Sequence, residues 1–270
     1  MFSPYYAWSG RRDPENHCAV NVALYGARSD RWAMTERGRG ALRRTPRTFA
    51  VGRSALHWSQ NGLTLDLDER SVPHLTAIRG TVSLTPDCRP GIDFALDAAG
   101  RHRWWPIAPM ARVSVELDSP RTSWRGHGYF DSNWGSEPLE AAFRRWDWSR
   151  FRGRDSAVVL YDAERRTGGD LSMALRFTPG GGVERVPSPP DRALPAGFWR
   201  VDRATRADEG QPATVARTLE DSPFYTREIL DTGLYGERGP AVHESLDLDR
   251  FENPIVRLML PFRMPRAAFG

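Results

Sequence analysis

The sequence predicts an all-β protein made of two antiparallel β modules and a few short helices. Two observations favour this class. Many short segments alternate apolar and polar residues, as half-buried strands do, and Gly and Pro residues separate them at intervals of about ten residues. Helical periodicity is scarce by comparison. The chain has 270 residues, 40% of them hydrophobic, and is long enough to bury a substantial core.

The expected strands follow from these patterns. Leucines alternate with polar residues over 63–68, and a second alternating run covers 111–118. The pair Asn61-Gly62 stands between two alternating runs, which predicts a β-hairpin. Further strands are expected at 18–26, 76–86, 157–163 and 171–179. Short helices are expected at 212–220 and 248–258.

The two modules are expected to meet near Phe151. Residues 1–150 contain about eight strand candidates, and this N-terminal module carries the proposed active site. Residues 151–270 form a smaller β module, which the proline-rich segment 186–199 interrupts. No fixed-period repeat or low-complexity tract is visible in the sequence.

Charge and cysteine content restrict the partners. The net charge is +4, and all 38 basic residues are arginines, scattered among 34 acidic residues. No basic block stands apart, so we expect no nucleic-acid partner, whereas a weak attraction to anionic lipid fits the charge. No apolar run approaches the roughly 20 residues of a membrane-spanning helix, and the N-terminus lacks a signal-peptide pattern. Cys18 and Cys88 form no CxxC motif, which favours a reducing cytoplasm.

Motifs for common cofactors are missing from the sequence. It has no Walker-type phosphate loop, no GxGxxG after a strand, no GxSxG elbow and no HExxH. The histidines are His17, His57, His74, His102, His127 and His243. Because they lack ligand spacing, we expect no metal and no cofactor, although a metal site assembled across strands stays open.

Two aromatic segments carry the candidate chemistry. In RHRWWP, His102 and Trp104 are two residues apart, so on a strand they point to the same side. In GHGYFDSNWG, the same spacing relates Tyr129 and Asp131. If the two segments pair or face each other, the four side chains converge on one pocket wall.

Such a set of residues favours acid catalysis on an alkene. A carboxyl group in apolar surroundings has a raised pKa and stays protonated, so Asp131 is a candidate general acid. The rings of Trp104, Trp134 and Tyr129 can stabilise a cation through their faces. Together these groups suit the protonation of an alkene to a carbocation.

Plainer interpretations stay open for each group. Tyr129 and the tryptophans can be core residues. Asp131 can form an Asx turn in Asp-Ser-Asn, and His102 can be exposed between two arginines. The segment 11–20 can be an ordinary charged loop with solvated Arg–Asp pairs.

Several ordered blocks resemble the bacterial carotenoid 1,2-hydratases, also called hydroxyneurosporene synthases. The blocks are FSPYYAWSGRRDPENHCAVNVALYG, RWAMTERGR, SVPHLTAIRG, GRHRWWP, GHGYFDSNWG and VHESLDLDRF, and the resemblance extends from Phe2 to Pro265. It implies an all-β fold of two lipocalin-like (calycin) antiparallel β-barrel modules in tandem. It also implies addition of water across the terminal C1–C2 double bond of an acyclic carotene such as neurosporene or lycopene, without a cofactor.

The resemblance assigns roles to four residues. The family's His-x-Trp pair corresponds to His102 and Trp104, and its Tyr-x-Asp pair to Tyr129 and Asp131. In this scheme Asp131 protonates C2, and Trp104 with Tyr129 stabilises the tertiary cation at C1. Water positioned by His102 or Tyr129 then adds, and His102 takes the surplus proton. Which of His102 and Asp131 performs each transfer stays open.

Three further aromatic residues are expected to bind the substrate. They are Phe130, Trp105 and Trp134. A carotene is insoluble in water, so the enzyme has to collect it from a bilayer. We therefore expect a cytoplasmic protein in peripheral contact with the inner (photosynthetic) membrane, with the segment 2–8 or 258–265 facing lipid. The alternative is that these two segments are terminal strands packed into the core.

Three other functions compete with hydration. A non-catalytic lipocalin-like carrier of an apolar ligand would use the same barrel but give Asp131 no role. A related cofactor-free terpenoid cyclase or isomerase would use the same acid. A glycosidase would need two opposed carboxylates, for which only Glu15 can be set beside Asp131. The preferred carotene, one-end or two-end hydration and the oligomeric state stay open.

Overall fold

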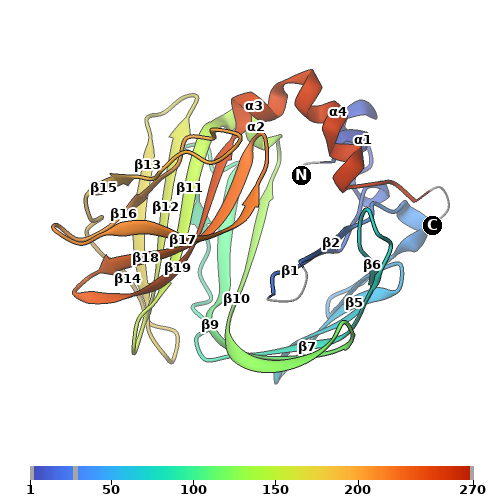
Figure 1. The fold of residues 1–270 in the computed structure, drawn as a ribbon, viewed down its shortest axis with the longest axis horizontal. Coiled ribbons are helices and arrows are strands. Elements are labelled where there is room, and N and C mark those ends of the chain that lie inside the picture. The colour runs from blue at the N-terminus through green and yellow to red at the C-terminus, as the bar shows by residue number, and fades with distance from the viewer. Residues whose placement is uncertain (1–2, 27–29, 268–270) are drawn as a thin grey trace. The chain divides into compact units, whose positions relative to one another are not determined.

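Antiparallel strands dominate the computed structural model, which describes residues 3–26 and 30–267. The strands form an eight-stranded sheet, a seven-stranded sheet and two two-stranded sheets (Figure 1). Alternating segments bury one side chain in two, and antiparallel sheets can bury one face while the other meets water. The predicted all-β class is confirmed.

The eight-stranded sheet has the order β10-β9-β7-β6-β5-β4-β3, and β8 pairs with β9. Its strands are β3 (Leu42–Thr45), β4 (Thr48–Val51), β5 (Ser54–Ser59), β6 (Gly62–Arg70), β7 (Ala77–Pro86), β8 (Phe94–Ala95), β9 (His102–Ser119) and β10 (Arg121–Gly135). A separate pair joins β1 (Asn21–Leu24) and β2 (Arg31–Met34). The predicted strands at 63–68, 76–86 and 111–118 are confirmed in this sheet.

The seven-stranded sheet has the order β14-β13-β12-β11-β19-β18-β17. Its strands are β11 (Phe143–Arg152), β12 (Ala157–Arg165), β13 (Leu171–Phe177), β14 (Val183–Arg185), β17 (Ala213–Asp221), β18 (Tyr225–Leu234) and β19 (Glu237–Asp247). A small ribbon joins β15 (Asp191–Ala193) and β16 (Ala204–Arg206). The predicted strands at 157–163 and 171–179 are confirmed as β12 and β13.

The helices of the described residues are short. They are α1 (Pro4–Trp8), α2 (Leu139–Ala142), α3 (Leu248–Glu252) and α4 (Pro254–Arg263), with 3-10 turns η1 (Pro14–Asn16) and η2 (Arg39–Ala41). The helix predicted at 248–258 is confirmed, but it is divided into α3 and α4. Asn253 has an extended backbone between them, because the ring of Pro254 disfavours a helical conformation in the residue before it.

The helix predicted at 212–220 is wrong. Residues 213–220 belong to β17, which pairs with β18 and contains two irregularities of register. Thr214, Val215 and Thr218 are β-branched and suit a strand. Pairing with a neighbouring strand therefore decides the conformation here, in place of a weak helical pattern.

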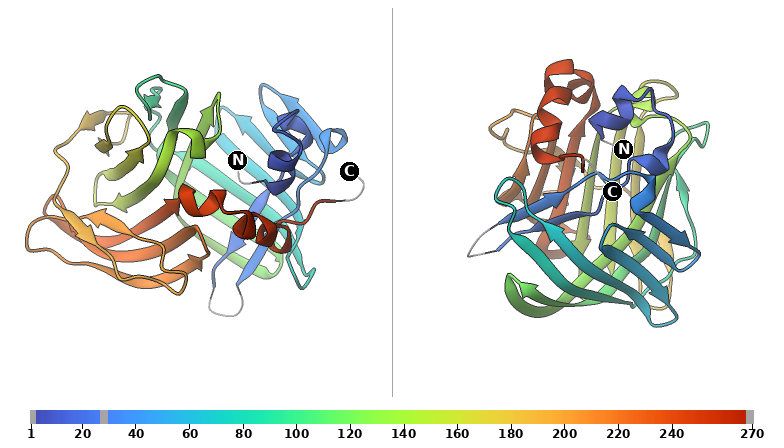
Figure 2. Two further views of the ribbon diagram at one scale, coloured as in Figure 1. Left: turned by 90° about the horizontal axis from the view of Figure 1, so that it is seen from above. Right: turned by 90° about the vertical axis from the view of Figure 1, so that its right-hand side faces the viewer.

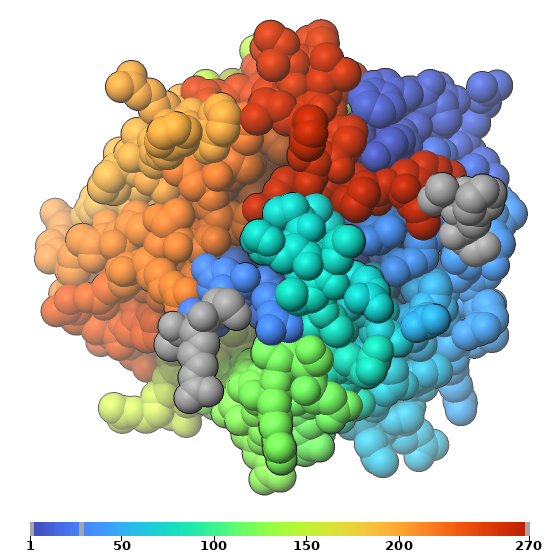
Figure 3. All heavy atoms as spheres, turned by 45° about the vertical axis from the view of Figure 1, so that its right-hand side comes forward, coloured from blue at the N-terminus to red at the C-terminus, as the bar shows by residue number. Residues whose placement is uncertain are grey.

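Both terminal segments considered for lipid contact are helical. Residues 4–8 of the segment 2–8 form α1, whereas Phe2 lies outside the described residues. Residues 258–263 of the segment 258–265 belong to α4, which lies at the surface (Figures 2 and 3). The alternative of terminal strands in the core is thus wrong. Among the described residues, no helix has the length and apolar character needed to cross a bilayer.

The hairpin predicted at Asn61-Gly62 is confirmed, with the turn shifted by one residue. Gly62 already pairs with Ser59, so Gln60 and Asn61 form the turn between β5 and β6. Gly62 has φ +131°, and a Cβ built there would lie 2.0 Å from the Leu84 carbonyl oxygen. Glycine is required at this position for the close approach of β7 as well as for the backbone conformation.

The chain forms two compact units. The first contains Met1–Pro86, Ala111–Gly128 and Arg257–Gly270, and the second contains Asp87–Met110 and Tyr129–Val256. Each unit has its own cluster of buried apolar residues. Phe151 is buried in the core of the second unit and lies within β11, so the expected meeting point falls inside a strand. The division into domains 1–150 and 151–270 stays a prediction.

Candidate active site

Two neighbouring strands, β9 and β10, carry the candidate residues, in the parts of these strands that belong to the second unit. Trp104 lies on β9, and Tyr129 and Asp131 lie on β10, the next strand of the sheet. The spacing of two residues turns Tyr129 and Asp131 to the same face of β10. An Asx turn at Asp131 is ruled out, because the residue lies inside the strand.

Three of the four expected catalytic residues form one hydrogen-bonded group. The Oδ2 atom of Asp131 accepts a hydrogen bond from the Trp104 Nε1 at 2.8 Å and another from the Tyr129 hydroxyl at 2.8 Å. The Trp104 Nε1 also lies 3.2 Å from the Tyr129 oxygen. Both donors therefore meet the same carboxylate oxygen of Asp131, and the Asn133 side chain is a further hydrogen-bond partner of this carboxylate.

Aromatic rings enclose this group. Trp104 is 0% exposed, and its ring centroid lies 5.6 Å from those of Phe94 and Tyr161. Phe177 meets it edge to face at 6.5 Å. The ring of Tyr129 lies 5.2 Å from that of Trp148. Neighbouring rings therefore cover the Trp104 side chain, and its indole N–H donates its shorter hydrogen bond to Asp131.

One face of the seven-stranded sheet supplies further residues. Trp148 on β11 stands directly opposite Tyr161 on β12 and Glu244 on β19. Directly opposed residues of antiparallel strands share a face, with Cβ atoms about 5 Å apart. The Glu244 Oε1 accepts hydrogen bonds from the Arg227 Nε and Nη2, each at 2.8 Å. A second carboxylate therefore lies beside the ring that packs on Tyr129.

The sequence interpretation missed Trp148, Tyr161, Glu244 and Arg227. Trp148 is two residues from Trp146 in FRRWDWSR, the same spacing that singled out the two predicted pairs. Glu244 is part of the block VHESLDLDRF. Its proximity to Trp148 depends on the pairing of β11 with β19, which no local pattern specifies.

Burial is the main cause that raises the pKa of Asp131, and the Glu244 carboxylate adds to it. The hydrogen bonds from Tyr129 and Trp104 stabilise the charged form and offset part of the rise. Burial and the neighbouring Asp131 also raise the pKa of the Tyr129 hydroxyl well above its usual range, so it stays a donor. These surroundings therefore favour the neutral form of the Asp131 carboxylic acid, and its conjugate base already accepts from Tyr129 and Trp104.

His102 lies apart from the hydrogen bonds of Asp131. It is buried at 1% exposure, so the alternative of an exposed histidine is wrong. Its Nδ1 lies 3.0 Å from the Asp97 Oδ2, and its Nε2 lies 3.1 Å from the Glu137 carbonyl oxygen. Although burial alone would raise the pKa of Asp97, hydrogen bonds from the backbone of Arg101 and from His102 hold it below its usual range. Both ring nitrogens thus face acceptors, and these contacts connect the beginning of β9 with the residues that follow the end of β10.

The expected substrate-binding residues lie on the other face of the same strands. Strand alternation turns Trp105 away from Trp104, and Phe130 and Trp134 away from Asp131. Trp105 is 40% exposed and Trp134 is 46% exposed, whereas Phe130 is partly buried. Their contact with a substrate stays a prediction.

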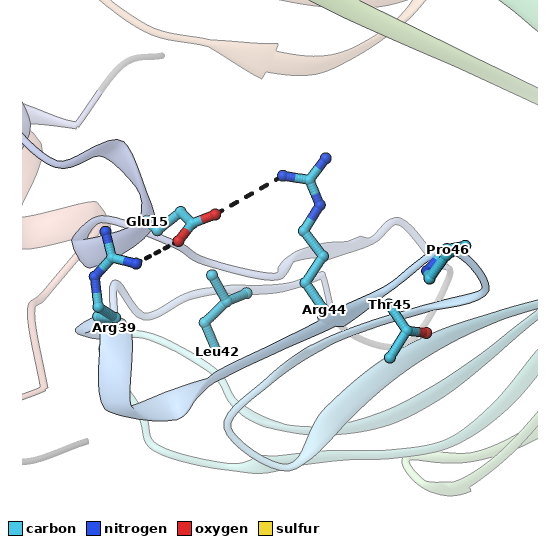
Figure 4. A pocket seen from close by; sticks show the side chains of 6 residues that line it. All are labelled: Glu15, Arg39, Leu42, Arg44, Thr45 and Pro46. Carbon is cyan, nitrogen blue, oxygen red and sulfur yellow. Dashed lines mark hydrogen bonds and ion pairs between the residues drawn. The ribbon is translucent and has the colours of Figure 1, made fainter.

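Two polar hollows contrast with the aromatic group. One lies in the first unit beside η2 and β3, where Glu15 forms ion pairs with Arg39 and Arg44 (Figure 4). Its exposed charges agree with the interpretation of the segment 11–20 as a charged loop. The other lies in the second unit and measures about 400 Å³, with a mostly charged lining that includes Asp147 and Arg206. Within the described ranges, no group of three or more His, Cys, Asp or Glu side chains is placed to hold a metal ion.

Comparison with known proteins gives matches over nearly the whole of this chain. Residues 1–269 match the family described as Carotenoid hydratase CrtC. An acyclic carotenoid 1,2-hydratase of Thiocapsa roseopersicina is 52% identical over 270 residues, which cover 98% of this chain and 67% of the relative. The enzyme of the same name in Rubrivivax gelatinosus is 48% identical, with 99% and 68% covered. That of Cereibacter sphaeroides is 42% identical, with 98% and 95% covered.

Solved structures with a similar fold have little sequence identity. A putative AttH from Nitrosomonas europaea superposes with a TM-score of 0.55 at 14% identity, covering 84% of this chain and 79% of that one. CghA, solved with Sch210972, gives a TM-score of 0.51 at 12% identity and covers 84% and 74%. These likenesses concern the fold alone, and they agree with the lipocalin-like class expected from the sequence.

Proposed function

The chain belongs to the carotenoid hydratase family, and we propose that it adds water across the terminal C1–C2 double bond of an acyclic carotene at the Trp104–Tyr129–Asp131 group. The observation that carries this proposal is a partly buried carboxyl group with two donors on one oxygen, enclosed by aromatic rings. A carboxyl group among aromatic rings can donate a proton to an alkene, and the rings can contact the apolar chain of that alkene. Neurosporene and lycopene are the proposed substrates, and the product is a tertiary alcohol.

Asp131 is the general acid in this mechanism. Its neutral carboxyl group gives a proton to C2, the C1–C2 π electrons form the new C–H bond, and the positive charge develops on the more substituted C1. The donors on Oδ2 stabilise the carboxylate that remains. Trp104 is a positioning residue for that oxygen, and the face of Trp148 beside Tyr129 stabilises the cation.

Glu244 receives the proton that the water loses. In the part of the chain that the structure describes, the buried Trp148 Nε1 has no hydrogen-bond partner, so this N–H can hold the oxygen of the attacking water. Glu244 stands opposite Trp148, and Arg227 supplies the counter-charge for its carboxylate. As the oxygen bonds to C1, the water proton passes to Glu244. Return of a proton from Glu244 to Asp131 through solvent completes the cycle.

His102 has a different role in this proposal from the one the resemblance suggested. Both of its ring nitrogens already face the acceptors of Asp97 and Glu137. This arrangement supports a positioning role, in which His102 holds the ends of β9 and β10 so that Trp104 meets Asp131. The resemblance had made it the acceptor of the surplus proton.

The substrate is proposed to come from lipid. A carotene partitions into the acyl region of a bilayer, so the enzyme needs peripheral contact with a membrane to collect it. The net charge of +4 supports contact with anionic headgroups. We place this contact at the cytoplasmic face of the inner membrane.

One experiment tests the reaction. Purified protein is mixed with neurosporene or lycopene in liposomes without any added cofactor, and the products are analysed by mass spectrometry. We expect a mass gain of one water, or of two where both ends of the carotene are hydrated. Incorporated carotene without a change would favour the carrier, and a product of unchanged mass would favour the cyclase or isomerase.

A further inference from the structure

The outer side of α4 is uncovered and apolar. Four of its side chains are spaced i, i+3, i+4 and i+7, which places them in one row along a helix. They are Ile255 (69% exposed), Leu258 (63%), Met259 (37%) and Phe262 (79%). A row of large apolar side chains exposed to water marks a surface that another phase or molecule covers.

The inner side of the same helix is apolar as well. Val256 and Leu260 are partly buried, and Met264, which follows the helix, is buried. A helix that is apolar all round is ordinarily buried all round. The inner row already packs on the protein, so the outer row is not needed to hold α4 in place.

The charges of α4 favour an anionic partner. The helix PIVRLMLPFR contains no acidic residue, and Arg257 and Arg263 are its only charged residues. The guanidinium of Arg263 lies over the ring of Trp32 at 4.5 Å, and its backbone carbonyl accepts the indole N–H of that residue at 2.9 Å. These contacts fix the C-terminal end of the helix. Two copies of such a helix would repel each other, whereas anionic headgroups attract both arginines.

A second exposed aromatic element is tied to the preceding helix. Phe198 is 85% exposed and Trp199 is 37% exposed, and their rings meet edge to face. Arg250 of α3 donates to the carbonyl oxygens of Trp199 at 2.5 Å and Arg200 at 2.7 Å, and the Phe198 N–H donates to the Asp221 carboxylate. Aromatic tips of this kind suit the headgroup level of a bilayer.

We propose that the outer row of α4 is a membrane-docking surface, which inserts its four apolar side chains into the headgroup boundary of an anionic bilayer. The choice of lipid over a protein partner rests on the proposed function, because the hydrocarbon substrate resides in a bilayer. A helix lying flat in this way buries its apolar side by several ångströms while its basic residues stay among the headgroups.

Vesicle sedimentation tests this surface. The wild type, the double variant Leu258→Ser/Phe262→Ser and the control Leu75→Ser are mixed with vesicles of phosphatidylcholine, with or without phosphatidylglycerol. Leu75 is 62% exposed, much like Leu258, but lies in a loop. We expect the wild type and the control to sediment with the anionic vesicles, and the double variant to bind at least about tenfold more weakly. Circular dichroism checks that each variant keeps its fold.

A parallel assay with carotene in detergent micelles separates this inference from the proposed function. If the double variant no longer hydrates carotene supplied in vesicles but still hydrates carotene in micelles as the wild type does, the result supports both the docking surface and the proposed function. A double variant that binds vesicles as tightly as the wild type overturns the docking surface, whatever the activity. A wild type that ignores lipid but dimerises through α4, as measured by size-exclusion chromatography, overturns it as well. Vesicle binding that depends on α4, without hydration in either assay, leaves the docking surface standing and removes the proposed reaction.

Discussion

Asp131 and Asp147 are partly buried acids of the same unit, and they differ in what surrounds them. Trp148, whose ring packs on Tyr129 of the Asp131 group, faces one side of β11, and Asp147, the residue before it, faces the other. Burial raises the pKa of Asp131 and raises that of Asp147 to about 7. A raised pKa therefore does not by itself identify the acid that acts on the substrate.

The neighbours of the two acids separate a site from a structural network. Asp131 has two donors on one oxygen, aromatic rings on its sides and a second carboxylate nearby. Asp147 accepts from the Ser245 hydroxyl at 2.5 Å, and Ser245 in turn lies 3.0 Å from the His243 Nε2. Burial lowers the pKa of His243 to about 3, so this histidine stays neutral. A mutually bonded network beside a hollow with many charged residues suits support of the fold better than alkene chemistry.

Exchanging each aspartate for asparagine gives the largest expected difference. Asp131→Asn removes the transferable proton, and hydration of neurosporene in micelles should fall by about 10²- to 10⁴-fold, the usual contribution of a general acid. Asp147→Asn should keep turnover within a few-fold of the wild type. Product formation measured by mass spectrometry decides between them. Equal losses in both variants would remove the distinction drawn between the two acids.

Much of the Trp104–Tyr129–Asp131 group could be predicted from the sequence. The spacing of two residues in a strand already turns Tyr129 and Asp131 the same way, and the pairing of β9 with β10 then brings Trp104 to them. Glu244 could not be found in this way. It lies 96 positions beyond Trp148, and only the register of β11 against β19 sets them side by side.

The errors of the sequence interpretation arise from partners nearer in the chain. The segment 212–220 contains a weak helical pattern, but the edge it offers to β18 makes it a strand. His102 has the spacing of a partner for Trp104, yet Asp97 and the Glu137 carbonyl bind its ring nitrogens. In each case a hydrogen-bonding partner outside the short motif decided the outcome: β18 for the segment 212–220, and Asp97 with Glu137 for His102.

Glu244→Gln should give the next largest effect. Loss of the proton acceptor should slow turnover by about 10- to 100-fold. The Glu244 charge also raises the pKa of Asp131, so its removal lowers that pKa, and the alkaline limb of the pH–rate profile should shift to lower pH. Asp231→Asn is the matched control, because Asp231 is an exposed carboxylate on β18 paired with Arg238. An unchanged profile for Glu244→Gln would contradict both roles.

Tyr129→Phe should have a smaller effect on rate and shift the pH profile the other way. The variant keeps the ring against Trp148 but loses the hydroxyl that donates to Asp131. One hydrogen bond to a charged group corresponds to about 2 kcal/mol, so turnover should fall by roughly tenfold to thirtyfold. That bond lowers the pKa of Asp131, so its loss raises the pKa and moves the alkaline limb to higher pH. A shift in the same direction as that of Glu244→Gln would contradict this assignment.

Asp147→Asn should act on stability more than on turnover. The pKa of Asp147 is about 7 in the folded protein, against about 3.9 in an unfolded chain. Because the folded pKa is raised, the contribution of Asp147 to stability is fully present below about pH 4 and is lost as the pH rises through 7. The loss is on the order of 4 kcal/mol at most, and asparagine, which does not ionise, avoids it.

Urea unfolding of the wild type and Asp147→Asn at pH 5 and pH 8 measures this difference. The wild type should lose more stability than the variant between the two values. His243 acts in the opposite sense, since its lowered pKa costs stability as the pH falls below about 6.5, but it is present in both proteins. Asp231→Asn, at an exposed site, should follow the wild type. A variant as sensitive to alkaline pH as the wild type would show that ionisation of Asp147 does not cause the loss of stability, and would contradict the raised pKa of Asp147.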